Sequence, residues 1–346
     1  MKSTLKNIYF FVFCGRILKR AKDSRLFLWI RLRKIALKYR KFDAIVVKDR
    51  KAGLFSIYFQ AITSYRIAQI NHQKVLFKFD SGPYFTELRC ETSWWDYYFD
   101  MNQSENYLNE RLPENSGSID SIHDQHELAK IGSQLERRNA FKVCNTFLLR
   151  PEVDQIIKTF IEQHFSGNFV IGVHYRGTDK VEGDSKESLR LDYHTVYRIF
   201  KGLADQGIVV KVFLATDEME FIRSFLRNTS FDCCYTQCFR SAYGDSIHLG
   251  NLSVCPYKKG IEAIVDAYLL SKCDFVIRTD SNLSKACEFL NPNLDVVNVS
   301  SLARASNEKY HHTKTIDLAT INRRISAAYC SKTGVAPVVR TGCRLR

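Results

Sequence analysis

Short apolar runs alternate along this chain with longer segments whose apolar residues recur every three to four positions. This alternation of strand-like and helix-like patterns is typical of α/β domains built around parallel sheets. The predicted strands lie near residues 43–50, 74–79, 169–175, 209–216, 274–278 and 294–299, and the predicted helices over 51–73, 152–164, 192–206, 220–228, 258–273 and 315–330. The pattern therefore predicts two Rossmann-like domains.

The predicted elements divide the chain into four segments. Residues 1–42 form a basic amphipathic segment, 43–165 a first Rossmann-like domain, 166–303 a second one, and 304–346 a terminal helix with a basic tail. A length of 346 residues agrees with two domains of ordinary size. Residues 101–135 are polar, and we expect surface loops with short helices there.

The positive charge is concentrated at the N-terminus. The net charge is +14, and residues 1–50 hold fifteen Lys and Arg against three Asp. Residues 25–42 combine these cations with apolar residues at helical spacing, which fits either a helix on an anionic membrane surface or an ordinary helix packed on the first domain. No run approaches the roughly 20 apolar residues that span a bilayer.

Eleven cysteines are scattered without CxxC pairs, which favours a reducing compartment. We therefore expect a cytoplasmic protein. The basic N-terminus adds the option of peripheral attachment to the inner face of a membrane. Cys233, Cys234 and Cys238 do not have the spacing of a zinc site, and no metal is predicted. Residues 93–99, SWWDYYF, are open to two interpretations: aromatic faces that bind sugar rings, or core packing.

The most informative stretch is FVIGVHYRGTDK, residues 169–180. A buried strand ends there in a polar cluster, and strand ends are where ligands bind in α/β sheets. The planar, permanently charged fork of Arg176 suits a diphosphate, and His174 projects from the same face of the strand. The competing interpretation is a surface ion-pair network in which Asp179 neutralises Arg176.

Other polar residues follow neighbouring strands, and we expect them at the same edge. Asp217 ends the next strand, and Asp266 lies on the helix before the third. Ser281, Asn282 and Ser284 begin a helix, where hydroxyls and backbone N–H groups favour an anion.

These motifs together resemble the α-1,6-fucosyltransferase and nodulation fucosyltransferase superfamily, with kinship to protein O-fucosyltransferases. The resemblance rests on HxRxTDK, then FLATDE, then KGxExxxDxxLLSxxDFxIxxxSxxS, and covers about residues 170–298. It implies a B-type glycosyltransferase fold, with two Rossmann-like domains facing across a cleft. It also implies an enzyme without a cofactor, in which GDP-fucose is the donor of an inverting, metal-independent transfer.

The resemblance also implies roles for single residues. Arg176 matches the arginine that holds the β-phosphate, and His174 and Asp266 match the pair that faces the guanine. Further donor positions fall on Thr178, Asp179, Lys180, Asp217, Ser281, Asn282 and Ser284. The chain departs from the family pattern HxRR at Gly177, so one cationic group is missing, and Lys180 is a candidate to compensate.

Inverting transfer needs a base for the acceptor hydroxyl. The loop after Lys180 offers Glu182 and Asp184, and the motif distance favours Asp184. The expected partners are a nucleotide sugar, an oligosaccharide or glycolipid acceptor, and an anionic membrane surface through residues 1–42.

The alternatives are a glycosyltransferase for another nucleotide sugar, a sugar-binding relative without activity, and a basic protein that binds nucleic acid or a membrane surface. Nucleic acid is not expected, because arginine-aromatic surface motifs are lacking in the folded part.

Overall fold

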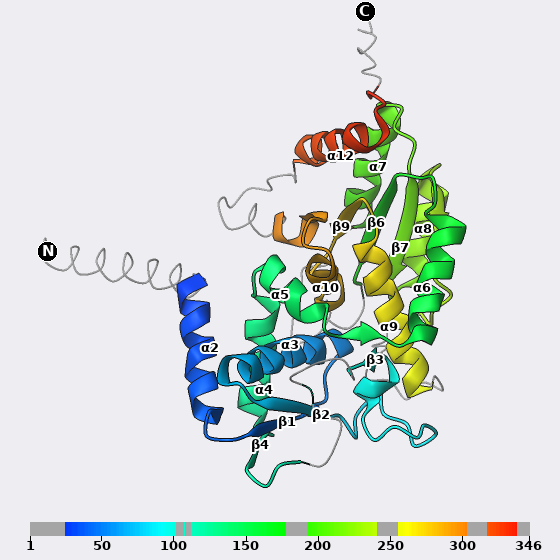
Figure 1. Ribbon diagram of the computed structural model, residues 1–346. Helices are drawn as coiled ribbons and strands as arrows, with labels where there is room; N and C mark the ends of the chain where they lie inside the picture. Colours follow the sequence, from blue (N-terminus) through cyan, green and yellow to red (C-terminus); the bar gives the residue numbers. More distant parts are fainter. Residues whose placement is uncertain are drawn as a thin grey trace, which may run out of the picture. The chain divides into compact units, whose positions relative to one another are not determined.

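The computed structural model describes residues 25–101, 107, 112–177, 192–240, 255–302 and 317–337. The chain divides into two compact units (Figure 1). The first consists of Met1–Gly82 and Cys90–Leu148, and the second of Pro83–Arg89 and Leu149–Arg346. In the described part of the chain, no helix is both long and apolar enough to cross a bilayer.

The first unit is built on a three-stranded parallel sheet in the order β2-β1-β4. Its elements are α2 (Arg25–Tyr39), β1 (Ala44–Lys48), α3 (Leu54–Asn71), β2 (Lys74–Lys78), the 3-10 helix η1 (Trp94–Tyr97), β3 (Phe99–Asp100), β4 (Ser116–Ile119), α4 (Ile122–Ser133), α5 (Arg137–Cys144) and β5 (Leu148–Leu149). The predicted helix–strand order from residue 25 to 78 agrees with this structure.

The polar region 101–135 is more regular than the sequence suggests. It contains the third sheet strand, β4, and the full-length helix α4. The strand could not be recognised from the sequence because SGSI has no apolar alternation. At Gly117 there is no room for a side chain, because the ring of Phe42 lies where a Cβ would be. The helix begins at Ser121, whose hydroxyl accepts the Asp124 N–H. The expectation of surface loops with short helices is therefore wrong here.

The aromatic run 93–99 belongs to the core of the first unit. Trp94, Trp95, Tyr97, Tyr98 and Phe99 are all at most 1% exposed. The ring centroids of Trp95 and Phe99 lie 4.4 Å apart. The Trp95 ring also packs against the buried rings of Tyr58, Phe77 and Phe147. These faces are occupied by one another, so the core interpretation holds and no face remains for a sugar ring.

The second unit contains a five-stranded sheet in the order β10-β9-β6-β7-β8, with every pair parallel. Its elements are α6 (Pro151–His164), β6 (Val170–Tyr175), α7 (Tyr193–Asp205), β7 (Lys211–Thr216), α8 (Met219–Asn228), β8 (Asp232–Cys234), α9 (Pro256–Ser271), β9 (Phe275–Arg278), α10 (Asn282–Leu290), β10 (Asp295–Asn298) and α12 (Leu318–Thr333). The predicted Rossmann-like pattern is confirmed for this unit.

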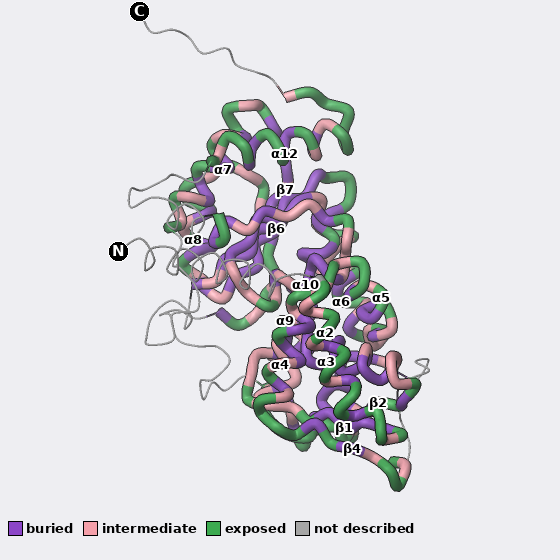
Figure 2. Tube along the Cα trace, turned by 90° about the vertical axis from the view of Figure 1, so that its left-hand side faces the viewer, coloured by how far each residue is buried: buried purple, intermediate pink, exposed green. Residues whose placement is uncertain are grey.

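The central strand β6 is buried along its whole length, and Figure 2 shows it and β7 in the buried colour. Ile171, Val173 and Tyr175 join one core with α7, α8 and α12. Gly172 faces α9 on the other side, where a Cβ would lie 2.9 Å from Leu270. Because strand residues alternate, His174 projects to the same side as Gly172. The alternation therefore places His174 beneath α9.

We predict that Gly132→Ala destabilises the first unit. At this position a Cβ would lie 2.1 Å from the carbonyl oxygen of Phe59, so α3 and α4 would have to separate. The expected loss is about 1–3 kcal/mol of the unfolding free energy. Denaturant unfolding of the variant measures it.

The matched control is Gly53→Ala. Nothing lies within 4 Å of that Cβ, and the φ of −64° suits any residue. Its change should stay below about 1 kcal/mol. Equal losses in the two variants would show that the helix contact is not tight.

Candidate functional site

The chain leaves β6 between two neighbouring strand ends that hold its backbone. The Arg176 N–H donates to Thr279 Oγ1 at 2.9 Å, and the Gly177 N–H donates to Asp217 Oδ1 at 3.2 Å. Thr279 follows β9 and Asp217 follows β7. Parallel register thus brings three predicted strand ends to one edge of the sheet.

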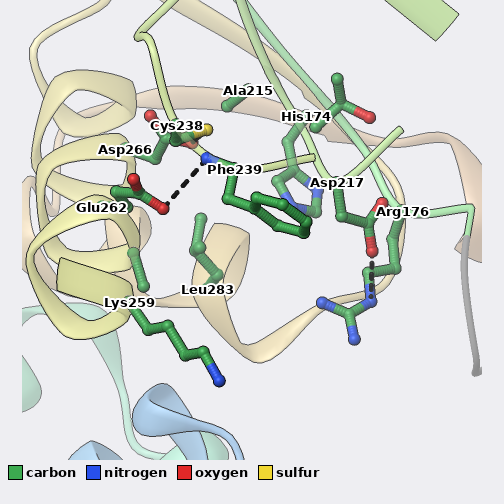
Figure 3. Close-up of a pocket in the computed structure, with 12 residues that line it drawn as sticks. His174, Arg176, Ala215, Asp217, Cys238, Phe239, Lys259, Glu262, Asp266 and Leu283 are labelled. Atoms are coloured by element: carbon green, nitrogen blue, oxygen red, sulfur yellow. Dashed lines mark hydrogen bonds and ion pairs between the residues drawn. The ribbon is translucent and has the colours of Figure 1, made fainter. Parts of the chain in front are cut away.

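A pocket opens at this edge, within the second unit (Figure 3). It is partly open to solvent and has a cavity volume of about 70 Å³. Four of the predicted site residues line it, namely His174, Arg176, Asp217 and Asp266. The sequence prediction that these side chains meet is consistent with this geometry.

Arg176 is held in place by an ion pair. Its Nε lies 3.1 Å from Asp217 Oδ2, and both side chains are about 10% exposed. Because Asp217 also accepts the Gly177 N–H, the carboxylate fixes both the backbone and the side chain of the arginine. A guanidinium fixed in this way is preorganised to bind an anion in the pocket.

His174 is a buried, neutral imidazole. Burial, and next the positive charges of Arg176 and Arg278, lower its pKa to about 3. Its Nδ1 makes no hydrogen bond within the described ranges. A neutral ring offers one donor and one acceptor nitrogen, so His174 can hydrogen-bond a neutral ligand group without adding charge.

Asp266 is a buried carboxyl group on α9. Thr236 Oγ1 donates to its Oδ1 at 2.7 Å, and Cys238 Sγ lies 4.0 Å from its Oδ2. Burial raises the pKa of Asp266 to about 6, against the lowering effects of Thr236 and Arg240. The group is ionised at neutral pH but close to protonation, which is a common property of functional sites.

Lys259, Glu262 and Phe239 also line the pocket, and the sequence analysis assigned none of them to the site. Lys259 and Glu262 precede Asp266 on α9 by seven and four residues, and helical spacing puts all three on one face. Helix periodicity and the motif KGxExxxD, which contains both residues, were the available signals for these two. Phe239 follows β8 in an irregular segment that gave no signal; Glu262 Oε2 accepts its N–H at 3.1 Å, and the ring projects into the pocket (Figure 3).

The predicted residues at the start of α10 have mainly local roles. Ser281 caps the helix by accepting the Leu283 N–H, and Ser284 is buried and donates to the carbonyl groups of Thr279 and Ser281. Asn282 is exposed. Of this turn, Leu283 is the residue that lines the pocket.

The remaining predicted residues lie outside the described ranges. They are Thr178, Asp179, Lys180, Glu182 and Asp184. The base and the proposed compensating cation therefore stay predictions.

Gly177 makes a close contact that explains its identity. A Cβ here would lie 2.1 Å from the carboxyl carbon of Glu218. Glu218 is 6% exposed, and Tyr193 donates its hydroxyl to Glu218 Oε2 at 2.6 Å. A buried carboxyl group thus occupies the space that any larger residue at 177 would need.

No metal centre is present within the described part of the chain, where no group of three His, Cys, Asp or Glu side chains could hold an ion. Burial raises the pKa of Cys233 and Cys238 to about 12 and that of Cys234 to about 11, so all three remain thiols at neutral pH. Neutral thiols are poor metal ligands.

The sequence matches the family described as Nodulation protein Z (NodZ) over residues 122–302, which is more than half of the chain. The chain belongs to the NodZ family. The match begins at α4 and extends through the whole sheet of the second unit. No protein in the curated collection matches the chain.

Solved structures of fucosyltransferases resemble the chain at low identity. A crystal structure of NodZ α-1,6-fucosyltransferase soaked with GDP-fucose is 17% identical, with a TM-score of 0.51 over 75% of this chain and 95% of that one. Fucosyltransferase NodZ from Bradyrhizobium is 16% identical, with a TM-score of 0.49 over 75% and 96% of the two chains. POFUT1 in complex with GDP-fucose is 9% identical, with a TM-score of 0.44 over 75% and 98%.

The predicted family is therefore confirmed, and with it the enzyme class, a fucosyltransferase-type glycosyltransferase. The likeness to the first of these structures agrees with the predicted B-type glycosyltransferase fold of parallel α/β sheets.

We predict that Gly177 and Glu218 are energetically coupled. Gly177→Ala should cost about 1–3 kcal/mol of unfolding free energy, because the new Cβ displaces a buried carboxyl group. In the double variant with Glu218→Ala, the loss should fall short of the sum of the single losses by about 0.5–3 kcal/mol. Denaturant unfolding of the four proteins measures this difference.

The matched control combines Gly177→Ala with Glu220→Ala, a change at an exposed neighbour. Those two losses should add. Additive losses in the Glu218 pair as well would contradict the contact.

Proposed function

We propose that this NodZ-family protein transfers fucose from GDP-fucose to a hydroxyl group of a glycan, with inversion and without a metal ion. The observation that supports this best is the pairing of Arg176 with Asp217 at the edge of a pocket that also contains Asp266. One end of the pocket is suited to a diphosphate and the other to a purine edge.

Asp266 is the proposed guanine-binding group. A carboxylate can accept both N1–H and N2–H of guanine, and these donors would stabilise the ionised form, which burial disfavours. His174 faces the same pocket as a neutral ring and supplies one more hydrogen bond. Asp266 and His174 together would distinguish guanine from pyrimidines by the pattern of hydrogen-bond donors on the base.

Arg176 is the proposed diphosphate ligand. In transfer without a metal, the charge that develops on the leaving GDP must be stabilised by fixed protein cations. Arg176 is preset by Asp217, and Lys259 enters the pocket from α9 in Figure 3. We propose that Lys259 provides a second positive charge, in addition to the predicted Lys180.

Inversion requires that the acceptor hydroxyl attacks the anomeric carbon from the face opposite the leaving GDP, while a base takes the proton. Asp184, with Glu182 as the alternative, is proposed as that base from the sequence motif. The proposed acceptor is an oligosaccharide or a glycolipid. Asp179, Thr178 and the α10 residues Ser281, Asn282 and Ser284 stay proposed donor-site positions.

A second candidate is a glycosyltransferase for another nucleotide sugar. The observation that favours it is Gly177, which stands where the fucosyltransferase pattern HxRR has a second arginine. The cation that takes the place of this arginine therefore matters for the choice of donor. Comparing GDP, UDP and CDP by thermal shift separates the two candidates, because a ligand that binds only the native state raises its melting temperature.

We predict that Arg176→Ala lowers transfer by about 100-fold or more and weakens GDP binding, because a preorganised charge is lost. The transfer rate and GDP affinity of Arg176→Lys should fall between those of the wild type and Arg176→Ala, since lysine keeps the charge without the planar fork. Turnover assays with GDP-fucose and calorimetry with GDP are the measurements.

Arg198→Ala removes an exposed arginine from α7 and serves as the control, with unchanged affinity expected. Normal GDP affinity in Arg176→Ala, in a protein of normal melting temperature, would remove Arg176 from the donor site.

We predict that GDP-fucose binds about tenfold more weakly at pH 5 than at pH 7. Asp266, with a pKa of about 6, takes up a proton over this range and loses its capacity to accept two hydrogen bonds, whereas His174, with a pKa of about 3, stays neutral. Calorimetry across the pH range measures the change.

The control is Asp266→Asn, in which binding should be weak and independent of pH. An equally steep pH profile in this variant would assign the dependence to another group.

A further inference from the structure

Helix α2 presents two different apolar faces. One packs on the first unit: Leu32, Ala36 and Tyr39 are at most 5% exposed. A second face is exposed, with Leu26 at 66% and Leu37 at 58%. A helix that is apolar on both sides has one side left for something outside the described fold.

Polar contacts fix α2 to the first unit. Arg31 pairs with Glu127, and Lys38 pairs with Asp124, which also accepts the Tyr39 hydroxyl at 2.9 Å. The orientation of the helix is therefore set by α4. Its exposed face cannot turn inward without breaking these contacts.

The exposed face forms a continuous stripe. Leu26, Ile30, Arg33 and Leu37 follow one another at intervals of three or four residues, Trp29 lies beside Ile30, and all five are exposed. The guanidinium of Arg33 lies 5.1 Å from the Trp29 ring centroid, which keeps the ring at the surface beside a cation. Large aliphatic side chains and a tryptophan together resemble the apolar face of an interfacial helix.

Cations lie in and beside the stripe. Arg33 lies within it, helical spacing puts Lys34 beside it, and Arg40 and Lys41 directly follow the end of the helix; all four are exposed. Within the described ranges, none of the four has an acidic partner, whereas the cations that point toward α4 are paired. The charge of this face is therefore complementary to an anionic surface.

We propose that this face of α2 docks on an anionic lipid surface, with Leu26, Trp29, Ile30 and Leu37 entering the headgroup boundary and the neighbouring cations contacting lipid phosphates. Nucleic acid also attracts cations, but it gives no reason for four exposed apolar side chains among them. A lipid surface satisfies both features at once.

Trp29 gives a specific optical report of this docking. The chain has three tryptophans, and the other two, Trp94 and Trp95, are 0% exposed. Trp29 is 53% exposed, so an aqueous quencher reaches mainly this residue in the free protein. A lipid-borne quencher would likewise reach it on docking.

The test adds full-length protein to phosphatidylcholine vesicles with or without phosphatidylglycerol. With the anionic vesicles, the Trp29 emission should shift to the blue, become shielded from iodide and be quenched by brominated lipid. Pure phosphatidylcholine should cause none of these changes, and high salt should weaken the binding. Trp29→Phe should abolish the optical change. If the protein co-sediments with anionic vesicles while iodide still quenches Trp29 fully, the proposal is overturned.

Two surface variants divide the binding into its parts. Leu26→Ser with Ile30→Ser should weaken vesicle affinity at least about tenfold by removing apolar burial. Lys34→Gln with Arg40→Gln should weaken it by about tenfold to thirtyfold. Both change exposed residues, so melting temperature and the thermal shift with GDP should not change.

The matched control is Lys201→Gln with Lys272→Gln, which removes two exposed lysines from the second unit and should leave vesicle binding intact. If this control lost as much vesicle affinity as the Lys34→Gln, Arg40→Gln variant, the effect would be one of net charge, and the proposed docking face would be wrong. A dimer that dissociates in the Leu26→Ser, Ile30→Ser variant without any vesicle binding would assign the stripe to a second copy. Salt-sensitive RNA binding without vesicle binding would assign the cations to nucleic acid.

Discussion

The site depends on where the chain leaves the central strand. β6 lies between β7 and β9, and its last residues are held from both sides, by Thr279 on one and Asp217 on the other. These two hydrogen bonds fix the backbone at Arg176. The side chain is then fixed by the same Asp217, so one carboxylate sets both the position and the direction of the charge.

Burial gives the two ends of the pocket opposite electrostatic character. It keeps His174 neutral and raises the pKa of Asp266 to about 6, while the guanidinium of Arg176 is paired with Asp217. A nearby buried pair, Arg278 with Glu288 at 2.7 Å, adds a positive field on His174. An ionised buried carboxyl group destabilises the fold, so Asp266 does not add to stability at neutral pH.

Much of the second unit was predictable from its sequence, because its strands are continuous apolar runs and its helices have a clear period. The same reasoning placed His174, Arg176 and Asp217 at one edge, since parallel strands end there. The prediction for Asp266, on a helix, came from the family resemblance instead. Reasoning from pattern failed for β4, whose SGSI sequence has no apolar alternation, and for Phe239, which lies in an irregular segment. It also left the role of residues 93–99 open, because aromatic clusters look alike in cores and in sugar sites.

The sequence by itself determined the α/β class, the family, and the residue types available at each strand end, since these follow from local pattern and spacing. Only the tertiary structure decided which groups share a pocket, because that depends on strand order and on which helix covers which face. It also decided which side of α2 is buried: both sides are apolar, and the contacts with α4 select one of them. Long-range packing is the reason in each case, because it joins residues that local periodicity treats independently.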